Sequence, residues 1–251
     1  MGQKIIPQSL RLNKTKNWNS NWIDDKVNYS KFFYFEYTLE QYLKKYGKRK
    51  GFVVTDVFIK QNNNYLDVNI CAFIIDTKKI GMAQELVKDT EIIVKDYLNE
   101  LGFNYYIPRI NLLDYNWLFF RLKSMFASKK KKYPFKIFRF LGAVHIGIFS
   151  KNIAVISNFL IENLKKTPRH KQYLSNMNKI LQKRYKTFKN CLGYKIQFKG
   201  RINGASRSRK LVLCEGKTPL NTLKYDIRYD FREVITPHGV CSLKFWVFYK
   251  R

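Results

Sequence analysis

The strongest constraint on the fold of this chain lies in its last sixty residues, where apolar and polar side chains alternate along several short segments. In Thr222–Asp230, four apolar or aromatic residues alternate with charged ones. A repeat of two residues is typical of a strand with one buried face. The pattern predicts a four-stranded sheet, with strands at Tyr194–Lys199, Leu211–Cys214, Thr222–Asp230 and Gly239–Tyr249.

A basic run that contains glycine joins the first two of these strands. Residues 199–210 hold five Lys or Arg, two glycines and no acidic residue. Glycine permits positive φ and a close approach of the backbone to a ligand, and closely spaced cations suit a polyanion. We expect a basic hairpin that binds phosphates, and the alternative is a solvated surface loop. The candidate phosphate ligands are Arg201, Arg207, Arg209 and Lys210.

The charge of the whole chain favours the same kind of partner. The sequence has 48 Lys and Arg against 18 Asp and Glu, a formal net charge of +30. Such self-repulsion disfavours a compact free protein, and nucleic acid is the polyanion that fits best. Hydrophobic residues make up 45% of the 251 residues, enough for folded cores rather than a disordered basic tail. The length predicts roughly two domains.

Other classes of protein lack support in the sequence. The most apolar stretches, at 138–149 and 153–164, fall short of the ~20 residues that a membrane span needs, so we expect no membrane partner. The cysteines are scattered without a C-x-x-C pair, which disfavours zinc and favours a reducing compartment. The histidines form no cluster either, and no cofactor, metal or catalytic residue is predicted. The four cysteines are Cys71, Cys191, Cys214 and Cys241, and the three histidines are His145, His170 and His238.

The rest of the chain predicts alternating helices and strands. Apolar residues recur with helical period, and Gly47 and Gly102 suit helix ends, in segments at Leu39–Tyr46, 82–101, 152–165 and 171–192. Further strands are predicted at Phe52–Lys60, 65–75 and Val144–Ile148. Residues 103–142, aromatic and basic, give no clear pattern. This order predicts two α+β domains.

Four short motifs occur in order along the chain, and together they resemble the ribosomal protein uS3 family of the small subunit. They are Gly2-Gln3-Lys4-Ile5-Ile6-Pro7 with Arg11-Leu12, Trp18-Asn19-Ser20-Asn21-Trp22, Gly200-Arg201-Ile202-Asn203-Gly204-Ala205, and Glu215-Gly216-Lys217-Thr218-Pro219-Leu220 with Asp226-Ile227. The resemblance is strong over 1–22 and 194–250, weaker over 38–76 and 143–193, and absent over 103–142.

The resemblance implies a domain plan. It implies a basic arm over 1–37, a type II KH-like domain over 38–150 with an insert at about 103–142, and a C-terminal α+β domain over 151–251, in which two helices pack on the four-stranded sheet. KH domains clamp single strands through a G-x-x-G loop. That loop is missing here, and Gly81 is the only candidate glycine, so we expect a degenerate KH domain.

The resemblance also implies a function. It implies a structural, non-enzymatic constituent of the subunit head that binds small-subunit rRNA and contacts mRNA at the entrance channel. The implied partners are rRNA, mRNA and neighbouring head proteins, and no homo-oligomer is expected. The residues expected on rRNA in the arm are Lys4, Arg11, Lys14, Lys16 and Trp18, with Trp22 as a second anchor; those expected at the mRNA entrance are Lys179, Lys183 and Arg184.

The composition suggests a compartment. Lys far outnumbers Arg, and Asn, Tyr, Phe and Ile are plentiful, which indicates an A/T-rich genome of the kind many organelles have. No presequence precedes the family's opening motif. We expect an organelle-encoded protein of the mitochondrial matrix, with a plastid as the alternative.

Two other functions remain open. An organellar intron-encoded nucleic-acid enzyme would also be basic, but it needs grouped carboxylates to hold divalent ions. Its candidate pairs, Asp24-Asp25 and Asp226 with Asp230, do not converge recognisably. A free-standing KH RNA-binding protein is disfavoured by the missing G-x-x-G.

Overall fold

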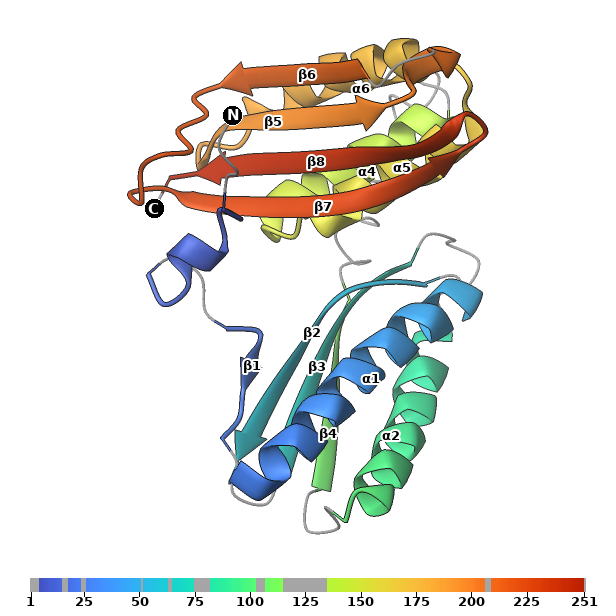
Figure 1. Ribbon diagram of the computed structural model, residues 1–251, viewed down its shortest axis with the longest axis vertical. Helices are drawn as coiled ribbons and strands as arrows, with labels where there is room; N and C mark the ends of the chain where they lie inside the picture. The colour runs from blue at the N-terminus through green and yellow to red at the C-terminus, as the bar shows by residue number, and fades with distance from the viewer. Residues whose placement is uncertain are drawn as a thin grey trace. The chain divides into compact units, whose positions relative to one another are not determined.

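The structure is a computed structural model that describes residues 5–14, 18–23, 26–50, 52–62, 65–74, 82–102, 107–114, 135–205 and 209–250. The chain forms two compact units (Figure 1). One comprises residues 18–120, and the other joins residues 1–17 to residues 121–251. We expected the domain boundary after residue 150. This position comes just after helix α4 (Phe135–Phe149), which packs in the core of the second unit.

The unit of residues 18–120 is a sheet with two helices on it (Figure 1). Its strands lie in the order β1-β2-β3-β4, with an antiparallel β2–β3 hairpin and parallel pairs β1–β2 and β3–β4. The elements are β1 (Ser20–Asn21), α1 (Lys26–Lys50), β2 (Phe52–Asn62), β3 (Tyr65–Ile74), α2 (Met82–Glu100) and β4 (Ile107–Asp114). The predicted strands at 52–60 and 65–75 and the predicted helix at 82–101 are confirmed.

Alternation along β3 builds the core of this unit. Leu66, Val68 and Ile70 are fully buried and pack in one cluster with apolar residues of α1 and α2. Helix α1 is much longer than the predicted Leu39–Tyr46, and the prediction that Gly47 ends it is wrong. Gly47 is buried inside the helix, because packing on the hairpin outweighs the cost of about 1 kcal/mol that an internal glycine carries.

The C-terminal unit is an antiparallel sheet with helices on one face (Figure 1). Its strand order is β6-β5-β8-β7. The elements are a 3₁₀ turn at Ser9–Arg11, α4 (Phe135–Phe149), α5 (Ala154–Lys166), α6 (His170–Tyr185), β5 (Cys191–Gly200), a 3₁₀ turn at Ile202–Gly204, β6 (Arg209–Gly216), β7 (Asp226–Thr236) and β8 (Gly239–Tyr249). The predicted four-stranded sheet is confirmed, and β8 has the predicted bounds.

Within the described part of this unit, three helices rather than the expected two cover the sheet. The predicted strand at Val144–Ile148 is wrong, because these residues form the end of helix α4. Phe140, Val144 and Ile148 recur every four residues in the core. Ala143 and Ile146 are buried as well, so α4 is apolar on nearly every side, and a short window of such a helix cannot be told from a buried strand by pattern alone.

Two other element ends differ from the prediction. Helix α6 ends at Tyr185 rather than near residue 192, and the chain enters β5 at Cys191. Strand β7 begins at Asp226 rather than Thr222. Residues 220–225 stay outside the sheet because their carbonyl groups accept hydrogen bonds from the N-terminal arm.

The start of helix α6 is held by the turn after β5. The side-chain oxygen of Asn203, at φ 55°, accepts a hydrogen bond of 3.2 Å from the backbone N–H of Lys171. The backbone N–H of Asn203 donates to Nδ1 of His170 at 3.4 Å. His170 is fully buried, and within the described residues its Nε2 has no partner. Burial, assisted by the charge of His238, lowers the pKa of His170.

This arrangement predicts a loss of stability in mild acid. The folded protein keeps His170 neutral, whereas the unfolded chain binds a proton below the ordinary pKa of about 6.5. The free energy of unfolding should therefore be highest above that pH and should fall as the pH decreases below it. Urea unfolding at pH 7.5 and 5.5 measures this dependence.

The control variant is His170→Asn, which keeps an acceptor for Asn203 but does not titrate. We expect a smaller pH effect than in the wild type. Some effect should remain, because burial also lowers the pKa of His145. Identical pH dependence in both proteins would contradict the assignment.

Candidate nucleic-acid interface

The residues predicted to bind RNA fall in the arm, the β5–β6 hairpin and helix α6. Lys4, Lys16 and Arg207 lie outside the described residues, as does Gly81, the candidate KH-loop glycine. The structure places the others in quite different environments.

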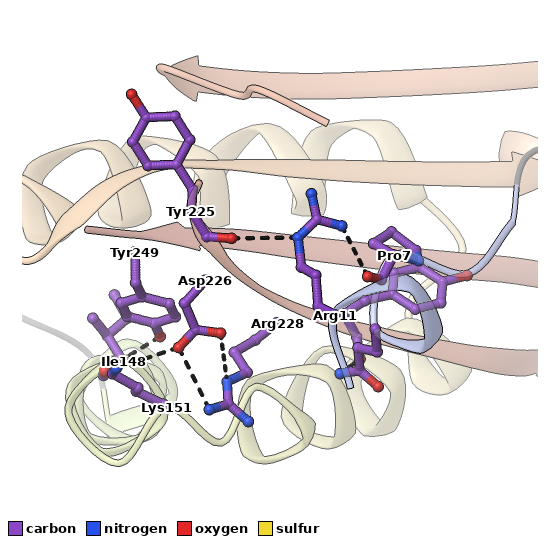
Figure 2. Close-up of polar contacts among 10 residues, drawn as sticks. Pro7, Arg11, Ile148, Lys151, Tyr225, Asp226, Arg228 and Tyr249 are labelled. Atoms are coloured by element: carbon purple, nitrogen blue, oxygen red, sulfur yellow. Dashed lines mark hydrogen bonds and ion pairs between the residues drawn. The ribbon is translucent and has the colours of Figure 1, made fainter. Parts of the chain in front are cut away.

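Arg11 is a buried anchor of the N-terminal arm. Its side chain is 1% exposed and donates to four backbone carbonyl groups. Two of these bonds, to Tyr225 and Pro7, are drawn in Figure 2. The distances are 3.3 Å to Tyr225, 2.8 Å to Pro7, 3.3 Å to Leu220 and 2.5 Å to Thr222. A guanidinium directed at carbonyl groups in this way has no open side for a phosphate, so the predicted rRNA contact of Arg11 does not fit this placement.

The arm is therefore attached to the C-terminal unit at more than one point. Gln8 donates from its side-chain amide to the carbonyl of Tyr229 at 2.9 Å. Lys14, three residues after Arg11, is exposed. It keeps a free surface on which the predicted rRNA contact can form.

A buried carboxylate lies beside this anchor. Asp226 is 4% exposed and forms ion pairs with Lys151 at 3.3 Å and Arg228 at 3.2 Å (Figure 2). Burial lowers the pKa of the Arg11 guanidinium. The charge of Asp226, which favours the protonated form, partly offsets this effect. Asp230 is paired separately with Arg232 at 3.1 Å. The two carboxylates thus neutralise cations rather than form a divalent-ion site.

The two tryptophans of the W-N-S-x-W motif differ. Trp22 donates from Nε1 to Glu36 at 2.8 Å and contacts the rings of Tyr29 and Phe32, with centroids 5.2 and 4.6 Å away. It anchors the segment to helix α1. Trp18 is 60% exposed, so its ring remains available to a partner.

The predicted basic hairpin is confirmed as a structure. Strands β5 and β6 pair with Lys199 opposite Lys210 and Gly200 opposite Arg209. Arg201 is exposed but donates to its own loop, to Ala205 at 3.1 Å and Gly204 at 3.5 Å. Successive strand residues point to opposite faces, so Arg209 and Lys210 do not form one cluster.

Helix α6 presents its cations as predicted. Leu174, Met177, Leu181 and Tyr185 are buried, and Lys179 and Lys183 are exposed on the opposite side. Arg184 is half-buried. It lies close to His145. Burial lowers the pKa of the His145 imidazole, and the nearby charge of Arg184 lowers it further. Lys179 and Lys183 are therefore open to solvent, whereas Arg184 is partly engaged.

Sequence reasoning missed the face of the C-terminal sheet that the helices leave uncovered. Lys195 and Lys199 on β5 alternate with the buried Tyr194, Ile196 and Phe198. This alternation was the available signal, because it places lysines on one face and core residues on the other.

The described residues hold no group of three or more His, Cys, Asp or Glu that could bind a metal ion. None of the helices described is long and apolar enough to cross a membrane.

Comparison with known proteins gives a consistent result. Residues 165–247 match the family "Ribosomal protein S3, C-terminal domain". The chain is 27% identical over 248 residues to small ribosomal subunit protein uS3 of Borrelia duttonii, which covers 99% of this chain and 75% of the relative. The uS3 protein of Borreliella burgdorferi is 24% identical over 251 residues, covering 99% and 70%. Both relatives are bacterial.

The placement of Arg11 predicts a stability effect. Replacing Arg11 by Met should lower the free energy of unfolding by about 2–3 kcal/mol, because charged hydrogen bonds to buried carbonyl groups are lost. Urea unfolding of the full chain measures the difference.

Lys14→Met is the matched control in the same arm, and it should change stability by no more than about 0.5 kcal/mol. If the two substitutions had equal effects, Arg11 would not be the anchor.

Proposed function

We propose that this chain is a member of the ribosomal protein uS3 family and a structural component of the small ribosomal subunit that binds rRNA and neighbouring ribosomal proteins. A protein of this family is structural and not an enzyme. The observation that carries the proposal is a match over nearly the whole chain, combined with 48 basic against 18 acidic residues. Phosphate neutralisation by such an excess of cations gives strong binding.

We propose further that the unit of residues 18–120 is a type II KH-like domain. Its order of helix, two antiparallel strands, helix and a last strand parallel to its neighbour supports this. The segment where a G-x-x-G loop would lie contains only Gly81. We therefore propose a scaffold role for this unit rather than a clamp on single bases.

The mRNA entrance is the proposed location of helix α6. Exposed Lys179 and Lys183 point away from the core, where a strand can pass, and Arg184 lies at the flank. Cations there would hold phosphates of separated strands and favour opening of duplex mRNA without nucleotide hydrolysis.

We also propose that the ribosome concerned is mitochondrial. Composition supports this, through the excess of Lys over Arg and the many Asn, Tyr, Phe and Ile residues. Fractionation of cells that express a tagged full-length chain tests it, and recovery outside mitochondria would refute it.

Sedimentation tests the central proposal. The native protein should migrate with the small ribosomal subunit in a sucrose gradient at moderate salt and leave it as salt increases. Migration at the top of the gradient in moderate salt would instead favour a free-standing RNA-binding protein.

The mRNA proposal makes its own prediction. Replacing Lys179 and Lys183 by Ala in reconstituted ribosomes should slow translation through structured messages more than through unstructured ones, because fewer cations hold separated strands. Elongation times on matched messages, with and without a hairpin, measure this.

Lys171→Ala, an exposed residue at the start of the same helix, is the control and should leave the ratio of the two times unchanged. Equal slowing on both messages by the double variant would show that these lysines serve assembly or general affinity instead.

A further inference from the structure

We propose that the face of the C-terminal sheet turned away from the helices is a stacking platform for a single-stranded stretch of RNA. The platform consists of Lys195, Lys199, Lys210, Tyr229, Phe231, Lys244 and Trp246. The inference rests on the proposed function, in that the ligand is RNA, but it assigns a surface that neither helix α6 nor the hairpin loop provides.

The two faces of the sheet differ in kind. Figure 1 shows α4, α5 and α6 together behind the strands, on one side of the sheet. Tyr194, Ile196 and Phe198 of β5 pack in the core with these helices. Because strand residues alternate, Lys195, Gln197 and Lys199 project from the other side. Trp246 belongs to a separate apolar cluster on that side.

Strand pairing arranges the platform in rows across the sheet. Lys195 lies opposite Trp246, which in turn lies opposite Tyr229. The next row brings Lys244 opposite Phe231. The row after that brings Lys199 opposite Lys210. Aromatic rings and lysines from all four strands therefore share one surface.

The rings and cations of the platform are already in contact. The Nζ of Lys195 lies 5.6 Å from the ring centroid of Trp246, and that of Lys244 lies 5.6 Å from the ring of Phe231. The rings of Tyr229 and Trp246 are 5.3 Å apart. Phe231 is 45% exposed, whereas Trp246 is 8% exposed. Phe231 is thus the ring most open to a base, and Tyr229 and Trp246 form the neighbouring row.

One end of the platform is covered by other residues of the same chain. Ile227 and Phe248, further along the same face, are buried in a cluster with Leu192 and Leu220. Gln8 of the arm donates to the carbonyl of Tyr229 at this end. The open part therefore runs from Tyr229 and Trp246 toward Lys199 and Lys210, beside the hairpin.

The charges of this face select an anionic ligand. Its described rows hold four lysines and one acid, Glu233, which lies opposite Ser242. Lys199 and Lys210 face each other directly, and like charges opposite each other are destabilising. An apolar protein surface would cover Phe231 but leave these lysines buried without partners, at a cost. Single-stranded RNA supplies base faces for the rings and phosphates for the lysines.

The test uses the purified full-length chain and a fluorescently labelled oligouridine of twelve nucleotides. Phe231→Leu keeps an apolar side chain and removes the ring, and it should weaken binding about tenfold, since stacking on one aromatic ring is worth about one to three kcal/mol. The separate variant Phe231→Trp keeps an aromatic ring and should bind at least as tightly as the wild type. Ultraviolet cross-linking should join uridine to Phe231 or Tyr229.

The lysines give a second readout. Replacing Lys199 and Lys210 together by Ala should reduce the slope of log affinity against log salt by roughly 1.4, at about 0.7 for each phosphate contact on a single strand. Ile235→Ala, on strand β7 like Phe231 and 70% exposed, is the control for both sets of variants and should leave affinity and slope unchanged.

The outcomes separate the two proposals. Wild-type affinity of Phe231→Leu, in a protein that unfolds at the wild-type temperature, would overturn the platform even if the chain sediments with the small subunit. Binding that depends on Phe231 in a chain that never joins the subunit would refute the proposed function and leave the platform intact. Competition by poly-glutamate as effective as that by RNA would identify an acidic protein as the occupant and overturn the inference.

Discussion

Repulsion among basic side chains is the constraint to which the rest of this structure responds. With 48 basic and 18 acidic residues, few cations can be paired within the chain. Arg11, which is buried, is surrounded by backbone carbonyl groups. The buried carboxylate of Asp226 pairs with both Lys151 and Arg228 nearer the surface. Other described cations, such as Lys14, Lys179 and Lys183, are exposed, where an external polyanion can neutralise them.

Burial of apolar side chains explains why each sheet is covered by helices on one side. Apolar residues gather on a single face of β3 and β5 and on the facing sides of the helices. In the C-terminal unit this leaves a second face on which lysines and aromatic rings alternate. A sheet with one apolar and one charged face can fold around its core and still present a broad cationic surface to solvent.

Much of this fold was predictable because short repeats act locally. The alternation in residues 65–75 and the strand pattern of 239–249 identified β3 and β8. The apolar stripe of residues 171–192 identified α6, with Lys179 and Lys183 on its outer side, although the helix ends at Tyr185. Helix α4 was not predictable in this way, since a segment that is buried on nearly all sides carries no period. Helix α1 was underestimated because Gly47 is a usual helix end, and only its packing on the hairpin retains it.

The sequence by itself determined the family resemblance, the polyanionic kind of partner and the strands of the C-terminal sheet, because charge and alternation are properties of residues and their neighbours. Only the tertiary structure decided which cations are free. Arg11 and Lys14 are close in sequence and both cationic, yet one is 1% exposed and the other is exposed. The difference arises from the carbonyl groups of residues 220–225, more than two hundred positions away. No local pattern encodes such a contact, since it forms only when β7 and the arm come together.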